Sequence, residues 1–90
     1  MRESQVVVIN RLGLHARAAA KLVRVANSYK SDVRLERTDR SAAADAKSIL
    51  NVLMLAAGCG ATLRLTIEGA DEAEALEAVC GLFREGFGEM

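Results

Sequence analysis

The sequence contains no proline and no tryptophan, and it has only one tyrosine and two phenylalanines among its 90 residues. A chain this poor in aromatic rings lacks the stacking surface on which proteins hold single-stranded nucleic acid. Its twelve basic and twelve acidic side chains cancel, so no net charge draws it to nucleic acid or to an anionic membrane. It also has no apolar run of the roughly 18 residues that a membrane helix needs. We therefore expect neither nucleic-acid binding nor membrane insertion.

Metal-binding motifs are also missing. The two cysteines, Cys59 and Cys80, form no Cys-x-x-Cys pair, and no histidine cluster accompanies them, so we expect no metal site and no cofactor. We interpret both as reduced thiols, mostly buried or incidental, with a disulfide or a reactive thiol as the less favoured alternative. Residues 1–5 lead straight into a short apolar segment, without the features of a signal peptide. These observations predict a cytoplasmic protein.

Apolar residues make up 51% of the sequence, which predicts a globular fold. The length suits one domain, 1–90, and we expect a monomer. Apolar periodicity predicts the order βαββαβα, with strands at 5–9, 33–36, 41–44 and 63–68, and helices from Ala16 to Asn27, from a cap at Asp45 to Gly58, and from Asp71 to Phe87. This order predicts an α+β open-faced sandwich, in which a four-stranded antiparallel sheet carries three helices on one face.

The three predicted helices differ in how their apolar residues are arranged. Two of them carry one buried stripe each, formed by Ala19, Leu22, Val23 and Ala26 in the first and by Leu76, Val79, Cys80, Phe83 and Phe87 in the last. The short middle helix is apolar on too many sides to face a single core. Either it is buried all round or it exposes an apolar patch, and we expect the patch, consisting of Ile49, Leu50, Leu53 and Met54.

The single histidine, His15, lies between the first strand and the first helix, in the segment Gly13–Arg17. We therefore expect it at or beside the helix N-cap, a position that normally holds Ser, Thr, Asp or Asn. The first turn of a helix has free N–H groups and a partial positive charge, which together bind anions. The same field disfavours an imidazolium, and so it favours a neutral, nucleophilic His15.

Arg17 can complete a phosphate site at this helix end. If the imidazole attacked a phosphoryl group, the new oxygens would meet backbone N–H groups and the guanidinium, whose planar fork binds phosphate through two nitrogens. Gly13 allows loop conformations that present the imidazole outward. Phosphoryl transfer depends mainly on positioning and charge stabilisation, which a small site can supply. On spacing alone, the alternative is a solvated loop histidine without a chemical role.

The stretch Asn10–Val23, NRLGLHARAAAKLV, resembles the active-site motif of the HPr family, the histidine phosphocarriers of the bacterial phosphoenolpyruvate phosphotransferase system. The segment Ala46–Leu50 is similar to the second signature of that family, at the start of its second helix. The segment Ala78–Phe87 resembles NPr, the nitrogen-branch member of the family. Two signatures in the right order, with matching element order and length, imply an HPr-like fold along essentially the whole chain.

The resemblance implies how the chain works. His15 corresponds to the histidine that carries the phosphoryl group on Nδ1, and Arg17, with the backbone N–H groups of Ala16 and Arg17, to the groups that stabilise it. The phosphoryl group would come from enzyme I, which phosphoenolpyruvate phosphorylates, and would pass to EIIA-type acceptors in sugar uptake or in nitrogen and carbon regulation. Such a chain is a phosphorylated protein intermediate rather than a stand-alone enzyme.

The resemblance also implies a regulatory position and a docking surface. Ser48 corresponds to the serine that HPr kinase/phosphorylase modifies in some bacteria, although a serine near a helix start is often only a cap. The apolar residues Ile49 and Leu50, with Lys47 and Arg24 nearby, correspond to the surface that docks on enzyme I and on EIIA-type proteins.

One position departs from the family, which usually has proline where this chain has Ala18. Alanine is a strong helix former, so we expect the first helix to begin normally. The branch of the system stays open, because the C-terminal segment favours NPr whereas Ser48 in its Lys-Ser-Ile context favours HPr.

Two other classes of function are less favoured by the sequence. A regulatory docking module of the same fold would not transfer phosphate, but such relatives typically lack the histidine that is present here as His15. A hydrolase that pairs His15 with Cys59 or Cys80 is disfavoured, because no acidic residue is identifiable that would orient the histidine.

Overall fold

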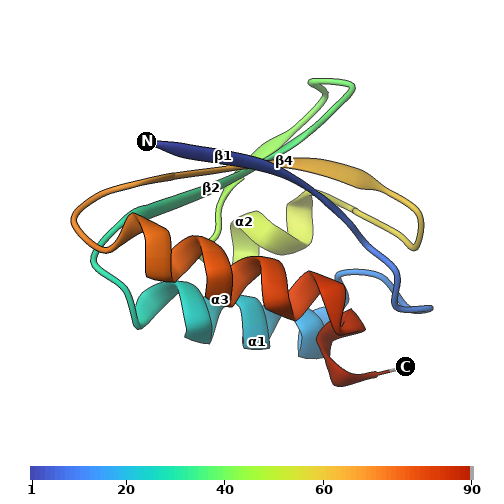
Figure 1. The fold of residues 1–90 in the computed structure, drawn as a ribbon. Coiled ribbons are helices and arrows are strands. Elements are labelled where there is room, and N and C mark those ends of the chain that lie inside the picture. Colours follow the sequence, from blue (N-terminus) through green and yellow to red (C-terminus); the bar gives the residue numbers. More distant parts are fainter. Residues whose placement is uncertain (90) are drawn as a thin grey trace.

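Four antiparallel strands form one sheet, and three α-helices lie against one of its faces, in the computed structural model, which describes residues 1–89 (Figure 1). The strands are β1 (Arg2–Val7), β2 (Asp32–Arg37), β3 (Ala43–Asp45) and β4 (Thr62–Glu68), in the spatial order β1-β4-β2-β3. The helices are α1 (Ala16–Asn27), α2 (Ile49–Met54) and α3 (Glu72–Arg84), and a 3₁₀ turn, η1 (Gly86–Gly88), follows α3. The predicted open-faced sandwich and its element order are confirmed.

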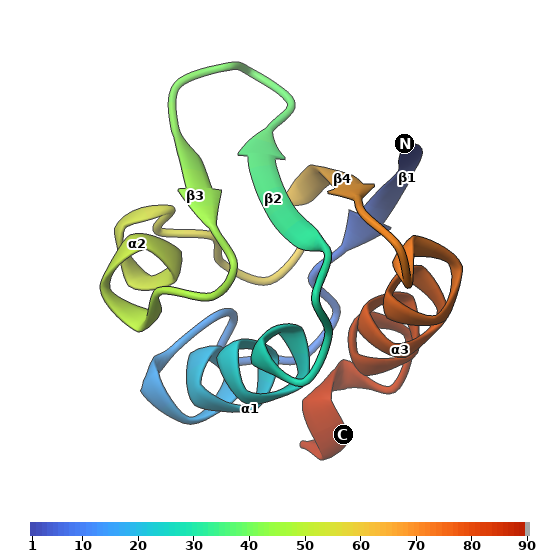
Figure 2. The ribbon, with the colours of Figure 1, turned by 90° about the vertical axis from the view of Figure 1, so that its left-hand side faces the viewer.

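The sheet is amphipathic because every second residue of its strands is apolar. In β4 the side chains of Leu63, Leu65 and Ile67 are fully buried, and they alternate with exposed or half-buried polar residues. Antiparallel pairing sets Leu35 of β2 opposite Leu65, and Val6 of β1 opposite Leu63, so the buried residues of three strands form one continuous face. Figure 2 shows the helices together on one side of this sheet.

The helix α1 packs on the sheet through small and branched residues. Its buried residues are Ala18, Ala19, Leu22 and Ala26, whereas the predicted core residue Val23 is only half-buried. The helix begins at Ala16, so alanine at position 18 is accommodated in a regular first turn, as expected. Because the side chain of alanine is only a methyl group, Ala18 and Ala19 let the start of α1 approach the core closely.

The predicted stripe of the last helix is only partly correct. Val79 and Phe83 are buried as expected, Leu76 and Cys80 are half-buried, and Phe87 is buried but lies outside the helix, in η1. The chain leaves the helix after Arg84 and folds back, and the ring of Phe87 meets that of Phe83 edge-on, with the ring centroids 4.9 Å apart. A helical extension to Phe87 is therefore wrong, although its burial is right.

The predicted boundaries of the first strand and of the middle helix are also wrong. The first strand covers Arg2–Val7 rather than 5–9, because its partner β4 begins at Thr62, which pairs with Val7. Asp45 does not cap α2: it still pairs with Arg34 as the last residue of β3. The helix α2 starts at Ile49, with Ser48 as its N-cap, and it ends at Met54 rather than at Gly58.

Both cysteines are free thiols. Cys80 is half-buried, so the expected burial is met in part at this position. Cys59 is exposed. Across residues 1–89, none of the helices has both the length and the apolar character needed to cross a bilayer.

Candidate functional site

His15 is the N-cap residue of α1, as the sequence predicted. Its backbone is extended, with φ −77° and ψ −179°, and its carbonyl accepts the first helical hydrogen bond, from the N–H of Ala19 at 2.8 Å. The Nδ1 atom of its ring accepts a hydrogen bond from the backbone N–H of Arg17 at 3.4 Å. The imidazole therefore takes the place of a usual capping side chain, with Nδ1 turned toward the positive end of the helix.

The loop before His15 is held by backbone contacts with the segment that follows α2. Gly13 has φ +69°, and a Cβ atom there would lie 2.7 Å from the carbonyl oxygen of Ala57, too close for any side chain. The next N–H, that of Leu14, donates to the same carbonyl oxygen at 2.9 Å, and the Leu14 side chain is buried. These contacts fix the backbone immediately before His15 and so fix where its ring emerges.

The N–H groups of Ala16 and Arg17 open the first helical turn beside Nδ1, and the one of Arg17 donates to Nδ1 itself. The N–H groups of Ala16 and Arg17 have no carbonyl partner within the helix, because no helical turn precedes them. Both residues are exposed. The predicted phosphate-binding N–H groups thus lie next to the predicted nucleophile.

The structure brings Arg17 to the same side of the molecule as the imidazole. It lines a cleft together with two other basic residues and with the C-terminal segment, and the lining residues are Arg11, Leu12, Arg17, Lys21, Gly88 and Glu89. Three cations around one cleft favour an anionic ligand. Arg11 and Lys21 were not singled out from the sequence, because their proximity to Arg17 depends on how the loop and the helix meet.

The sequence also gave no indication of Glu89, which contacts His15 directly. Its carboxylate oxygens lie 2.7 Å and 2.9 Å from Nε2 of His15, although 74 positions separate the two residues. The side-chain amide of Asn10 also donates to this carboxylate, at 2.9 Å. Hydrogen bonds from His15 and then Asn10 lower the pKa of Glu89, partial burial opposes them, and the charges of His15 and Arg17 add smaller contributions in the same direction. The side chain of Glu89 is therefore ionised at neutral pH.

The predicted apolar patch is present on α2. We call it the α2 patch, and it consists of Ile49, Leu50, Leu53 and Met54, whose exposed fractions run from 38% to 70%. The alternative, a helix buried on every side, is wrong, because only Val52 of α2 is buried. Leu50, at 64%, has most of its side chain in solvent.

The two basic residues expected beside the patch differ in their surroundings. Arg24 is exposed in the last turn of α1, which packs against α2. Lys47 is half-buried, and its ammonium group donates to the carbonyl oxygen of Tyr29 at 2.9 Å. Arg24 thus has no ion pair among residues 1–89, whereas Lys47 also ties the start of α2 to the segment that follows α1.

Ser48 caps α2. Its hydroxyl oxygen accepts hydrogen bonds from the backbone N–H of Asn51 at 3.4 Å and from the Asn51 side-chain amide at 3.2 Å. The capping role that was the alternative interpretation of this serine is therefore realised. Ser48 is half-buried and lies directly before the α2 patch.

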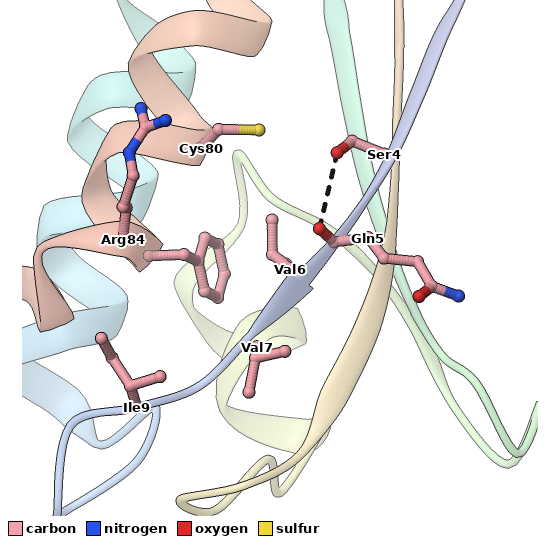
Figure 3. A pocket seen from close by; sticks show the side chains of 8 residues that line it. Ser4, Gln5, Val6, Val7, Ile9, Cys80 and Arg84 are labelled. Carbon is pink, nitrogen blue, oxygen red and sulfur yellow. Dashed lines mark hydrogen bonds between the residues drawn. The ribbon is translucent and has the colours of Figure 1, made fainter.

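A separate hollow lies between β1 and α3 (Figure 3). Val7 and Ile9 form one side of it, and Cys80 and Arg84 line the side formed by α3. Within residues 1–89, no hydrogen bond or ion pair joins these side chains to His15. With apolar walls and one exposed cation, this hollow supplies no arrangement for phosphoryl chemistry.

The chain matches a known family along nearly its whole length. The family described as "PTS HPr component phosphorylation site" matches residues 2–85. The phosphocarrier protein HPr of Cupriavidus necator is 47% identical over 89 residues, covering 99% of this chain and 98% of that protein. The phosphocarrier protein NPr of Shewanella violacea is 40% identical, over 97% of this chain and 93% of that protein.

Solved structures agree with the sequence relatives. The crystal structure of an HPr from Thermoanaerobacter tengcongensis superposes with a TM-score of 0.92 at 36% identity, covering 100% of this chain and 99% of that one. The histidine at the helix start, the antiparallel sheet and these relatives lead to one conclusion: the chain belongs to the HPr family of phosphocarrier proteins of the phosphotransferase system.

Proposed function

We propose that this protein accepts a phosphoryl group from phosphorylated enzyme I on Nδ1 of His15, and that it passes the group to EIIA-type acceptors in the cytoplasm. The observation that carries the proposal is the place of the imidazole at the N-cap of α1, with Nδ1 beside the N–H of Arg17. Because a helix N-terminus binds anions, this position brings a side-chain nucleophile and a phosphate-binding helix end together.

The transfer step needs little beyond positioning. The lone pair of Nδ1 leaves its hydrogen bond with the N–H of Arg17 and attacks phosphorus. The Nδ1–P bond forms, and the bond from phosphorus to the donor breaks, with its electron pair leaving on the donor. The phosphoryl oxygens then face the N–H groups of Ala16 and Arg17, while the guanidinium of Arg17 approaches from the cleft. The reverse step on an acceptor protein completes the carrier cycle.

Docking on these partners would use the α2 patch and Arg24. An exposed apolar patch of this kind marks a surface for protein contact. Leu50 and Met54 are its most exposed members, and Met54 can adapt its flexible side chain to more than one partner. Lys47 would contribute its remaining hydrogen-bonding capacity at the edge of the same surface.

Ser48 would be the regulatory position, modified by an HPr kinase/phosphorylase. A phosphate on its hydroxyl would put negative charge at the start of α2, beside the patch that partners contact, and so would alter docking. Relatives named HPr and NPr both match the chain, so similarity alone does not choose between the sugar and the nitrogen branch.

Phosphorylation in vitro tests the proposal. With phosphoenolpyruvate and purified enzyme I, the wild type should gain one acid-labile phosphate, and His15→Ala should gain none. Ser48→Ala is the control that should be labelled like the wild type, because this serine takes no part in the transfer. Equal labelling of the wild type and His15→Ala, or no labelling of either, would overturn the proposal.

A further inference from the structure

We propose that Glu89 is a positioning residue for His15: its carboxylate accepts the Nε2–H of the imidazole, so that the lone pair stays on Nδ1, and it balances the positive charge that the ring gains on phosphorylation. The inference rests on the proposed function, in which His15 is the nucleophile. It assigns a role to a residue that lies beyond residues 2–85, the part that the family match covers.

The partners of the two ring nitrogens leave one arrangement for the neutral imidazole. On the Nδ1 side the partner is the backbone N–H of Arg17, which can only donate. On the Nε2 side the partner is an ionised carboxylate, which can only accept. The ring therefore carries its proton on Nε2 and its lone pair on Nδ1, the nitrogen that faces the helix N-terminus.

The C-terminal segment is folded so that it delivers this carboxylate. Gly86, Phe87 and Gly88 have φ angles of 59°, 57° and 73°, a run of left-handed conformations that turns the chain back toward α1. Figure 1 shows the red segment that follows α3 at the end of the molecule where α1 begins. A non-glycine residue adopts this conformation only where its surroundings hold it, and Phe87 is held in the core.

A cation on α1 adds a second anchor for the segment. The ammonium group of Lys21 donates to the carbonyl oxygen of Phe87 at 2.6 Å. The backbone on which Glu89 depends is thus tied to α1 itself, the helix that His15 caps. This attachment limits how far the carboxylate can move from the ring.

Asn10 fixes the carboxylate from the other side. Its buried side-chain amide group donates to the carbonyl oxygen of Gly13 at 2.8 Å and to Glu89 Oε1 at 2.9 Å. Its amide oxygen is buried and has no hydrogen-bond partner among residues 1–89. A buried acceptor without a partner is unfavourable, so the orientation of Asn10 is dictated by the two acceptors that its NH₂ group serves.

The chemistry explains why a carboxylate belongs at this place. When Nδ1 bonds to phosphorus, the ring keeps the Nε2 proton and becomes an imidazolium, so no proton has to leave His15 during the step. Glu89 is already hydrogen-bonded to that proton, on the side of the ring away from the phosphoryl group. The carboxylate therefore stabilises charge that develops during transfer, as the aspartate of a Ser-His-Asp triad stabilises the imidazolium of its histidine.

NMR of the imidazole tests the contact without any partner protein. His15 is the only histidine, so every imidazole signal belongs to it. In the wild type we expect a protonated Nε2, an unprotonated Nδ1 and an Nε2–H proton protected enough from solvent to be observed directly. Glu89→Ala should lose this proton signal through fast exchange. Glu85→Ala, which removes an exposed carboxylate from the same segment, should keep it. A wild type protonated on Nδ1, or identical signals in Glu89→Ala, would overturn the inference.

Transfer kinetics separate this inference from the proposed function. At saturating phosphorylated enzyme I, Glu89→Ala should lower the maximal rate of phosphorylation about tenfold with little change in KM, because a charge-assisted hydrogen bond to the reacting ring is lost. Glu85→Ala should match the wild type. A normal rate in Glu89→Ala would refute the role of Glu89 alone, whereas a wild type that accepts no phosphoryl group would refute the proposed function.

Discussion

Replacing Gly13 by alanine tests how the His15 loop is held against the body of the protein. Gly13 has φ +69°, and an added Cβ would lie 2.7 Å from the carbonyl oxygen of Ala57 and 2.8 Å from Cα of Gly58. Both neighbours are backbone atoms, which cannot swing aside as a flexible side chain can. The same carbonyl oxygen accepts the N–H of Leu14, so a shift that relieves the clash would strain that hydrogen bond as well.

The expected loss of stability has two parts. Left-handed backbone costs a residue with a Cβ about 1–2 kcal/mol. Forcing a methyl group into close-packed surroundings adds about 1–3 kcal/mol. The alanine variant recovers about 0.4–1 kcal/mol because its unfolded chain is less flexible. We therefore expect Gly13→Ala to lower the free energy of unfolding by about 3 kcal/mol, which corresponds to a fall in Tm of about 12–24 °C for a domain of this size.

Two other glycines separate the parts of this effect. Gly60 has φ +94° but open space where its Cβ would stand, so Gly60→Ala measures backbone strain alone. Gly58 has open space and no positive φ, so Gly58→Ala should be neutral or slightly stabilising. Urea unfolding and thermal melts of the three variants should rank Gly13→Ala as the least stable, then Gly60→Ala, then Gly58→Ala. If Gly13→Ala unfolded with the same free energy as Gly60→Ala, the close approach of Ala57 would be refuted.

Two further predictions concern other parts of the molecule. The pKa of Asp71 is lowered from 3.8 to about 2, first by the hydroxyl of Ser31 and then by backbone N–H groups, so this carboxylate stabilises the fold fully above pH 4 and loses that contribution as the pH falls toward 2. Ser31→Ala should therefore flatten the fall of the urea midpoint between about pH 4 and 2, and an unchanged slope would contradict the assignment. Leu50→Ala should weaken binding of enzyme I about tenfold in titration calorimetry with little change in stability, because this side chain is 64% exposed on the α2 patch. Val7→Ala, which truncates an apolar residue 45% exposed on β1, should bind normally, and equal losses in both variants would argue against docking through α2.

The regular elements were predictable because their signals are local. The alternation of Leu63, Leu65 and Ile67 identifies a strand wherever its partners lie, and the apolar face of α1 is visible in the spacing of Ala19, Leu22 and Ala26. Boundaries were less predictable, since they depend on partners. Asp45 has the chemistry of a helix cap, but its pairing with Arg34 keeps it in a strand.

The sequence by itself determined that a histidine followed by Ala16 and Arg17 stands where a helix begins, because the glycine before it and the apolar period after it are properties of neighbouring residues. Only the tertiary structure decided what surrounds that histidine. The carboxylate of Glu89 reaches Nε2 across 74 positions, and no period or motif links two residues so far apart. The carboxylate lies there because Phe87 is buried in the core, and its left-handed backbone turns Gly88 and Glu89 back toward α1. Contacts of that kind follow from how the whole chain packs, whereas the position of His15 at a helix start follows from its neighbours in the sequence.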